Sequence, residues 1–439
     1  MSLIRPGSRI FASRLVQVAA NAAVVLIVAS ILGPEGQGHY SLTLALALLL
    51  ASLLAGGQGL AAVPLLRRGS PSGARIFRAQ LLWAAGALVV MLLLAAATMA
   101  PGPTGFLAAH LGWFPGLGFV VVGAVMGILL FEIFSYDLLA RGRLVVGAVI
   151  NGTRALTHLV LVCLAAVAGA LTLGKAVGLV AAAQALGGFL VVVVAGREIR
   201  HAVVGASGAV AGDTTRSSGD PPLSLTGLMM FLARRGWLGQ LSAVAYFLLL
   251  RLDQALLEHF RGAAEVGVYS VAVYFGEMLW LLPGALTPLL VHSATAERGD
   301  GTGDRDSLGA VRLGLVVTLA AGIPLYFLAG PLLPFLAGGS YVASGPALRA
   351  LLPGIVAFAP GAVLAGDFIG RGRPHWNTQA SLITLVINIV AGLWLIPVHG
   401  AVGAGWASTI AYTCGSALMI ARFLSASGYP FRSLFTGRP

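Results

Sequence analysis

Long apolar segments alternate with short polar ones along the whole chain. Twelve of the apolar segments have roughly the 20 residues that a helix needs to cross a bilayer. They form two sets of six, at 11–32, 41–66, 77–99, 117–139, 146–170 and 176–196, and at 226–250, 268–291, 309–330, 347–369, 377–397 and 401–424. The pattern predicts an all-α polytopic membrane protein with twelve transmembrane helices.

The composition supports a membrane protein over a soluble one. Apolar residues make up 58% of the chain and charged residues only 10%, whereas a soluble domain carries about 25% charged residues. The mean hydropathy is +0.92. The two cysteines, Cys163 and Cys414, lie inside apolar segments, and their spacing indicates neither a metal site nor a disulfide framework.

The net charge of +12 would indicate a nucleic-acid partner in a soluble protein. Here it follows the positive-inside rule. If the N-terminus is cytoplasmic, the predicted inner segments carry 22 of the 27 Arg and Lys residues, and the predicted outer loops at 100–116 and 331–346 carry none. The charge distribution predicts a multi-pass protein with both termini in the cytoplasm and no nucleic-acid partner.

Short sequence matches recur between the two sets of six. GPEGQGHYS at 33–41 matches GAAEVGVYS at 262–270, Arg-Gly-Arg at 141–143 recurs at 371–373, and Ala-Val-Gly at 176–178 recurs at 401–403. Their order is the same, and their offsets are 229, 230 and 225 residues. Because each copy carries six segments, both copies have the same orientation in the membrane, as in transporters whose two halves rock to open a cavity alternately.

A 20-residue stretch rich in Gly, Ser, Thr and Pro separates the two copies. Such a composition is typical of a flexible tether. The sequence therefore predicts an N-lobe at 1–204 with spans 1–6, a cytoplasmic linker at 205–224, and a C-lobe at 225–439 with spans 7–12. The two lobes are expected to form parallel six-helix repeats around a central cavity.

Three stretches carry a family resemblance. They are LGPEGQGHYSLTLAL at 32–46, LDQALLEHFRGAAEVGVYSVAVYFGEMLWLLP at 252–283, and INIVAGLWLIPVHGAVGAGWASTIAY at 387–412. They resemble the polysaccharide flippase branch of the multidrug/oligosaccharidyl-lipid/polysaccharide transporters. The resemblance implies alternating access and translocation of a polyprenyl-pyrophosphate-linked oligosaccharide from the cytoplasmic to the outer leaflet, for cell-surface polysaccharide synthesis.

The same resemblance implies a location and partners. It places the chain in the bacterial cytoplasmic (inner) membrane, among membrane lipids, with the lipid-linked saccharide as its substrate. A polysaccharide polymerase and other assembly proteins are further expected partners. The related lipid II flippases usually have fourteen spans, so the count of twelve counts against that branch.

Several polar residues inside the predicted spans are candidates for binding the substrate. Arg14, Gln17 and Asn21 lie at i, i+3 and i+7 on one face of the first span. We expect this stripe to line the cavity, with Arg14 on the pyrophosphate, because a guanidinium donates two hydrogen bonds to phosphate. The alternative is that Arg14 reaches out to the inner membrane interface.

Two further pairs belong to this set. Arg154 and His158 lie one turn apart in the fifth span, deeper in the span than residues that only anchor a loop at the membrane surface. A lone histidine there is more often a hydrogen-bonded core residue, but a neighbouring arginine inside the membrane favours function. Arg234 and Arg235 open the seventh span. They either face the cytoplasmic mouth of the cavity, as expected for Arg14, or only set the topology of the chain in the membrane.

Acidic residues give fewer candidates. Glu277 lies about two turns inside the eighth span, where an unpaired carboxylate is unfavourable. It is expected either to bind a coupling H⁺ or Na⁺ or to form an ion pair, with a cavity arginine or between helices. Arg251 and Asp253 are expected to end the seventh span as an interfacial anchor or turn cap.

No catalytic motif emerges, so the chain is not expected to be an enzyme and no cofactor is expected beyond a coupling ion. A Walker loop is absent from the sequence, which excludes ATP hydrolysis by that motif. A polymerase or ligase would need a substantial outer loop, and the predicted outer loops are short. A multidrug or cation exporter of the same superfamily is the transport alternative, although acids are scarce in the first six spans.

Overall fold

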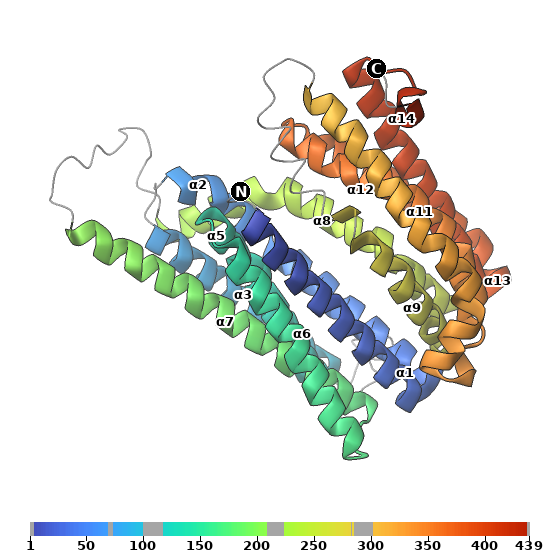
Figure 1. Cartoon of the computed structure of the whole chain (residues 1–439). Helices are drawn as coiled ribbons and strands as arrows, with labels where there is room; N and C mark the ends of the chain where they lie inside the picture. Colours follow the sequence, from blue (N-terminus) through green and yellow to red (C-terminus); the bar gives the residue numbers. More distant parts are fainter. Residues whose placement is uncertain are drawn as a thin grey trace. The chain divides into compact units, whose positions relative to one another are not determined.

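A computed structural model describes residues 4–68, 73–99, 117–208, 224–281, 283–284 and 302–436. Within these ranges the chain is helical and contains no strand (Figure 1). Nine of the described helices are long and apolar enough to cross a membrane. The prediction of an all-α polytopic membrane protein is confirmed.

The first half of the chain forms α1 (Ile4–Ala55), α2 (Gln58–Arg68), α3 (Gly73–Met99), α5 (Leu117–Ala140), α6 (Leu144–Val167) and α7 (Leu173–Gly208). The second half forms α8 (Leu225–Arg261), α9 (Ala263–Glu277), the 3₁₀ turn η1 (Met278–Trp280), α11 (Thr302–Ala337), the 3₁₀ turn η2 (Gly339–Tyr341), α12 (Ser344–Gly370), α13 (Pro374–Ser427) and the short α14 (Ser433–Thr436).

Two of these helices each contain two predicted spans. The 52-residue α1 breaks at Gly33, whose φ is 68°, and the 54-residue α13 breaks at Gly400, whose φ is 56°. Glycine adopts positive φ without the steric penalty of a Cβ, and Pro34 suits the first turn of the helix that follows Gly33. Nine long helices in the described ranges match twelve predicted spans because α1 and α13 each contain two spans. The short α9 corresponds to the remaining one.

Three predicted boundaries were wrong. The polar stretch after Gly33 and the one after Gly262 are the first turns of helices and not loops, because a single positive-φ glycine redirects the chain at each point. The seventh span does not end at Arg251 and Asp253. α8 continues to Arg261, since hydrogen bonds within the protein satisfy both charged side chains.

The internal duplication is visible in local geometry. Gly33 and Gly262 are equivalent by the 229-residue offset, and both have positive φ. The two Arg-Gly-Arg turns also agree, since Gly142 and Gly372 have φ of 73° and 69°. In each turn the amide of the second arginine donates to the carbonyl five residues earlier, at 2.8 Å, the bond of a Schellman helix end.

The chain divides into two compact units. The first unit comprises Met1–Ala20, Thr43–Ala165 and Gly174–Leu241. Its core lies between α3, α5 and α7 and includes Leu129 and Phe134. The predicted lobe boundaries differ from this division and stay a prediction. Part of the predicted linker, 209–223, lies outside the described residues.

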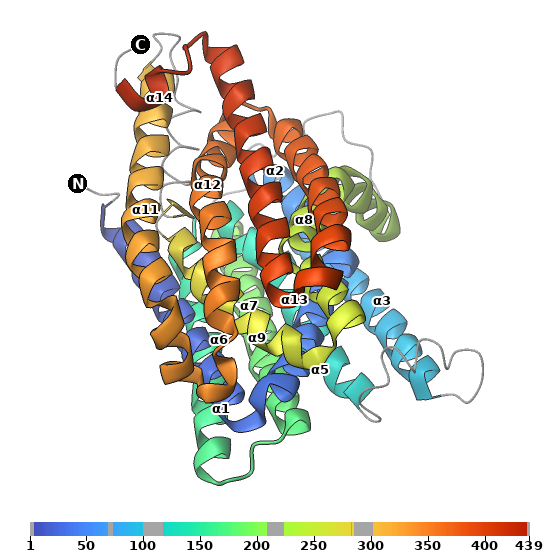
Figure 2. The same ribbon diagram turned by 90° about the vertical axis from the view of Figure 1, so that its right-hand side faces the viewer.

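The second unit comprises Asn21–Leu42, Ala166–Leu173 and Ser242–Pro439. Figures 1 and 2 show α11, α12 and α13 running side by side within it. Its core includes Tyr269 and Tyr341, both fully buried. The predicted eighth span extends to 291, past the described part of that segment.

The two copies of the repeated motif meet within the second unit. A Cβ placed on Gly38 would lie 1.9 Å from the carbonyl oxygen of Ala263, and one on Gly267 would lie 1.8 Å from that of Pro34. Gly38 is equivalent to Gly267, and Pro34 to Ala263, so the contact is reciprocal, as around a local two-fold axis. Gln37 Nε2 also donates to Ser270 Oγ at 3.2 Å.

Candidate functional site

Arg154 lies deep within α6, in the first unit. Ten residues separate it from the start of the helix at Leu144, a rise of about 15 Å. That is roughly half of a hydrocarbon core about 30 Å thick. At this depth a guanidinium does not easily reach either interface, and charged groups so placed face the protein interior or water.

Three helices hold the Arg154 side chain in place. Its Nη2 donates to Asn151 Oδ1 on the same helix, and Asn151 Nδ2 donates to Gln17 Oε1 of α1 at 2.7 Å. The guanidinium carbon lies 4.6 Å from the centre of the Phe131 ring on α5, a cation–π distance. On α7, a Cβ at Gly187 would come within 2.7 Å of Arg154 Cδ. Two of the predicted polar stripes, from α1 and α6, are therefore joined.

Arg154 forms no ion pair with any carboxylate in the part of the chain that the structure describes. A guanidinium carries five N–H donors, and Asn151 accepts from one of them. The remaining donors and the uncompensated charge suit a bidentate anion. His158, one turn further along α6, is buried beside it.

The other predicted cations lie on α1 and α8 in the first unit. Arg14, Arg234 and Arg235 are exposed. The guanidinium of Arg235 lies 5.9 Å from the Phe231 ring. No described contact links these three arginines to Arg154, and their role in binding substrate stays a prediction. Asn21 belongs to the second unit, where it hydrogen-bonds Tyr274.

Gln240 of α8 forms a polar cluster in the first unit that the sequence did not reveal. Its Nε2 donates to Ser52 Oγ at 2.8 Å and to Glu132 Oε1 at 3.1 Å, and its Oε1 accepts from the Gly57 amide at 3.1 Å. Gly57 and Gly236 approach each other through their backbones. The cluster therefore ties the beginning of α8 to α1 and α5.

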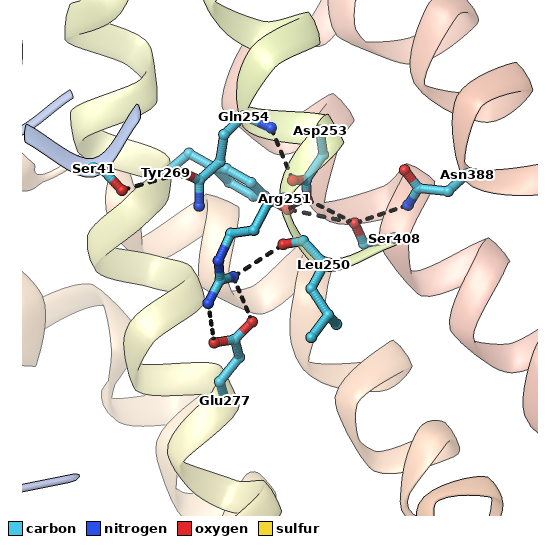
Figure 3. A network of polar contacts seen from close by, with 9 residues as sticks. All are labelled: Ser41, Leu250, Arg251, Asp253, Gln254, Tyr269, Glu277, Asn388 and Ser408. Carbon is cyan, nitrogen blue, oxygen red and sulfur yellow. Dashed lines mark hydrogen bonds and ion pairs between the residues drawn. The ribbon is translucent and has the colours of Figure 1, made fainter. Parts of the chain in front are cut away.

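Glu277 forms an ion pair with Arg251 in the second unit (Figure 3). Arg251 Nη1 donates to Glu277 Oε1 at 2.7 Å and Nη2 to Oε2 at 2.8 Å. This bidentate geometry is the strongest form of such a pair. The side chains are 23% and 19% exposed. Of the two expectations for Glu277, the structure shows the ion pair, and ion coupling stays untested.

Asp253, two residues after Arg251 on α8, lies in a buried network (Figure 3). Its Oδ2 accepts from the Tyr269 hydroxyl at 2.6 Å and from Ser408 Oγ at 3.1 Å, and Asn388 Nδ2 donates to Ser408 Oγ at 3.3 Å. Asn388 Oδ1 is buried without a partner. The network joins α8 and α9 to both halves of α13. The network was not predicted from the sequence, because 155 residues separate Asp253 from Ser408.

Four aromatic rings form a cluster in the second unit, and one of them, Trp280, follows Glu277 by three residues. Trp280 packs against Phe358 and Tyr412 with ring centres 5.2 and 5.7 Å apart. Phe358 also lies 5.2 Å from Tyr412 and 6.4 Å from Tyr246. Within the described ranges, no three His, Cys, Asp or Glu side chains gather as they would around a metal ion.

Comparison with known sequences finds one relative at low identity. No family model matches the chain. The chain is 26% identical over 203 residues to a protein of Haloferax volcanii described as probable flippase AglR. This match covers 43% of the chain and 40% of the relative, so the chain spans less than half of that protein's length in the alignment.

Comparison with solved structures covers nearly the whole chain. The lipid II flippase MurJ in an inward closed conformation aligns over 99% of this chain and 90% of its own, with a TM-score of 0.73 and 13% identity. An inward-facing multidrug resistance MATE family transporter of the MOP superfamily aligns over 94% of each chain, with a TM-score of 0.62 and 17% identity. At these identities the likeness establishes the fold.

Proposed function

Because the chain has the fold of the flippases and transporters of the MOP superfamily, we propose that it is a lipid flippase. Its substrate is a polyprenyl-pyrophosphate-linked oligosaccharide, carried from the cytoplasmic to the outer leaflet by alternating access for cell-surface polysaccharide synthesis. The similarity to a probable flippase supports this choice within the superfamily. The chain acts as a transporter and not as an enzyme.

The observation that carries the proposal is the anchored and uncompensated Arg154. A pyrophosphate cannot enter hydrocarbon without losing its hydration, which is strongly unfavourable. A guanidinium held at mid-membrane depth offsets that loss with charge-assisted hydrogen bonds. Gln17, Asn151 and Phe131 restrict its motion before substrate arrives, so less entropy is lost on binding.

An exporter of cationic drugs is the alternative that the fold supports equally well. Such a transporter needs negative charge where its substrate binds. In the first unit, the carboxylate of Glu132 already accepts a hydrogen bond from Gln240, whereas the cation Arg154 has no acidic partner in the described ranges. This charge distribution favours an anionic substrate. A polymerase or ligase remains the enzymatic alternative and has no observation in its favour.

The test is a flipping assay in proteoliposomes with a fluorescent polyprenyl-pyrophosphate oligosaccharide. We expect Arg154→Gln to lower the initial rate at least about tenfold, a loss of about 1.4 kcal/mol. Arg154→Lys is expected to retain part of the rate, because ammonium supplies charge without the planar fork. Arg143→Gln, which removes an exposed ion pair to Glu198 in the same unit, is the control. Full activity of Arg154→Gln would contradict the proposal.

Location and coupling are parts of the same proposal. The protein acts in the bacterial cytoplasmic membrane with both termini inside, among membrane lipids and beside a polymerase and other assembly proteins. H⁺ or Na⁺ drives the cycle. Flipping measured with imposed H⁺ and Na⁺ gradients checks this, and a rate that ignores both gradients in wild type and in Glu277→Gln removes ion coupling through Glu277.

A further inference from the structure

The ion pair and the aromatic cluster of the second unit form one mixed surface. Tyr246 lies on α8, five residues before Arg251, and Trp280 follows Glu277 by three residues on η1. Phe358 of α12 and Tyr412 of α13 pack behind them. The four rings and the two charges thus come from five elements, α8, α9, η1, α12 and α13, all within one unit.

Part of this surface is exposed. Tyr246 is 39% exposed, and the side chains of Arg251 and Glu277 are 23% and 19% exposed. An arginine–glutamate pair within membrane-spanning segments does not face hydrocarbon, since charged groups in spans turn toward the protein interior or water. The exposed ring of Tyr246 lies on the same helix as Arg251, five residues before it.

The charge balance of this surface does not suit pyrophosphate binding, which is the role proposed for Arg154. Glu277 neutralises Arg251 through two hydrogen bonds, so the pair carries no net charge for a pyrophosphate. Its hydrogen-bonding capacity is not exhausted. Each carboxylate oxygen has a further lone pair, and Arg251 Nε has no partner in the described ranges. Such a pair suits a neutral ligand that offers both donors and acceptors.

We infer that this surface is the sugar site of the transporter and that it binds one pyranose residue of the glycan. The ring faces of Tyr246 and Trp280 cover the apolar C–H face of the pyranose, whose hydrogens meet the negative face of an aromatic ring. Arg251 and Glu277 bind its hydroxyls. Aromatic walls with a few placed polar groups are typical of small-molecule sites. This inference rests on the proposed function and assigns the saccharide to the second unit.

Trp280 is fixed for this purpose. Its Nε1 donates to the Ile355 carbonyl at 3.1 Å, which sets the orientation of the ring, and Phe358 and Tyr412 pack against it. A ring so held loses little entropy when a ligand stacks on it. Trp394 of α13 offers a matched control in the same unit, because it is 82% exposed and has none of these contacts in the described part of the chain.

The experiment measures binding to the full-length protein in nanodiscs. The probes are a fluorescent polyprenyl pyrophosphate without sugar and the same lipid carrying one glucose, galactose or N-acetylglucosamine residue. Wild type is expected to bind at least one glycosylated probe about tenfold more tightly than the sugar-free lipid. Trp280→Leu and Tyr246→Leu are expected to abolish that preference and to leave binding of the sugar-free lipid within twofold. Trp280→Phe, which keeps a ring, and Trp394→Leu are expected to retain it.

The outcomes separate this inference from the proposed function. If wild type binds all four probes with equal affinity, or if Trp280→Leu and Tyr246→Leu both keep the preference, the sugar site is wrong while the flippase proposal stands. If wild type binds none of the probes, the proposed function itself fails. Retained binding of the sugar-free lipid by both leucine variants shows that they are folded, so a lost preference reports on the site.

Discussion

Two arginines inside helices show how the neighbours of a charge determine its use. Arg154 has an amide, an aromatic ring and a glycine around it and no acid among the described residues. Arg251 has a bidentate carboxylate. The first arrangement leaves charge for an incoming anion, and the second leaves hydrogen-bonding groups without net charge. Both side chains avoid lipid for the same reason, the high free energy of a charge in hydrocarbon.

The anchoring of Arg154 by Asn151 is testable by itself. In Asn151→Leu the guanidinium loses its acceptor and the link to Gln17. We expect about a tenfold weaker binding of the pyrophosphate probe, because a mobile side chain loses more entropy on binding. Thr153→Val, an exposed change on the same helix, is the control. Unchanged affinity of Asn151→Leu in the nanodisc assay would show that anchoring is unimportant.

The Arg251–Glu277 pair makes a prediction about stability. Removing one partner leaves the other charge partly buried without a counter-ion, which costs up to about 3 kcal/mol. Arg251→Met and Glu277→Met are each expected to lower the thermal midpoint in detergent. The double variant is expected to be more stable than the worse of the two single variants, since two apolar side chains replace a buried pair with little loss. If the losses of stability of the two single variants simply add in the double variant, the two groups are not coupled.

Sequence reasoning found the charged residues but not their partners. Arg154 and Glu277 stand out because ionisable residues are rare in apolar segments. Asn151 was visible as well, one turn before Arg154. Phe131, Ser408 and the aromatic cluster were not, because aromatic and hydroxyl residues in a span are ordinary. Their proximity depends on helix packing, and a single sequence carries no signal for it.

At the scale of elements, glycines set the course of the chain. Gly33, Gly262 and Gly400 have positive φ and separate successive helices with a single residue. Gly38 and Gly267 serve a different purpose, because they let α1 and α9 touch through their backbones. The repeated motif thus contains one glycine for the turn and one for the contact between copies.

The glycine contact predicts an asymmetry between alanine substitutions. Gly38→Ala and Gly267→Ala place a methyl group within 2 Å of a carbonyl oxygen, so the helices must separate. We expect each to lower the thermal midpoint by several degrees. Gly309→Ala in α11, which meets open space, is expected to be neutral or stabilising by up to about 1 kcal/mol, since alanine favours helix. Equal effects at the three positions would contradict the assigned contact.

The hydrophobic pattern predicted the helices well and their ends less well. Segment length and Arg distribution respond to the bilayer, so they locate spans. They do not report where a helix stops once it leaves hydrocarbon. α8 therefore extends past Arg251, and α7 extends to Gly208, into the predicted linker. Polar residues after a positive-φ glycine read as a loop, although they form the first turn of the next helix.

At the scale of the whole molecule, duplication supplies two copies of one scaffold, and substitution gives them different chemistry. The helix breaks and the Arg-Gly-Arg turns are shared. The anchored arginine lies in the first unit and the ion pair with its aromatic neighbours lies in the second. The fold and the duplication are readable from the sequence, whereas this division of chemistry needed the structure.

The most direct test of the account is transport by the purified protein in proteoliposomes, with two substrates supplied in parallel. One is a fluorescent polyprenyl-pyrophosphate oligosaccharide and the other is a fluorescent lipophilic cation. The account predicts translocation of the pyrophosphate-linked saccharide that is lost in Arg154→Gln, and no transport of the cation. Transport of the cation without movement of the saccharide would contradict it.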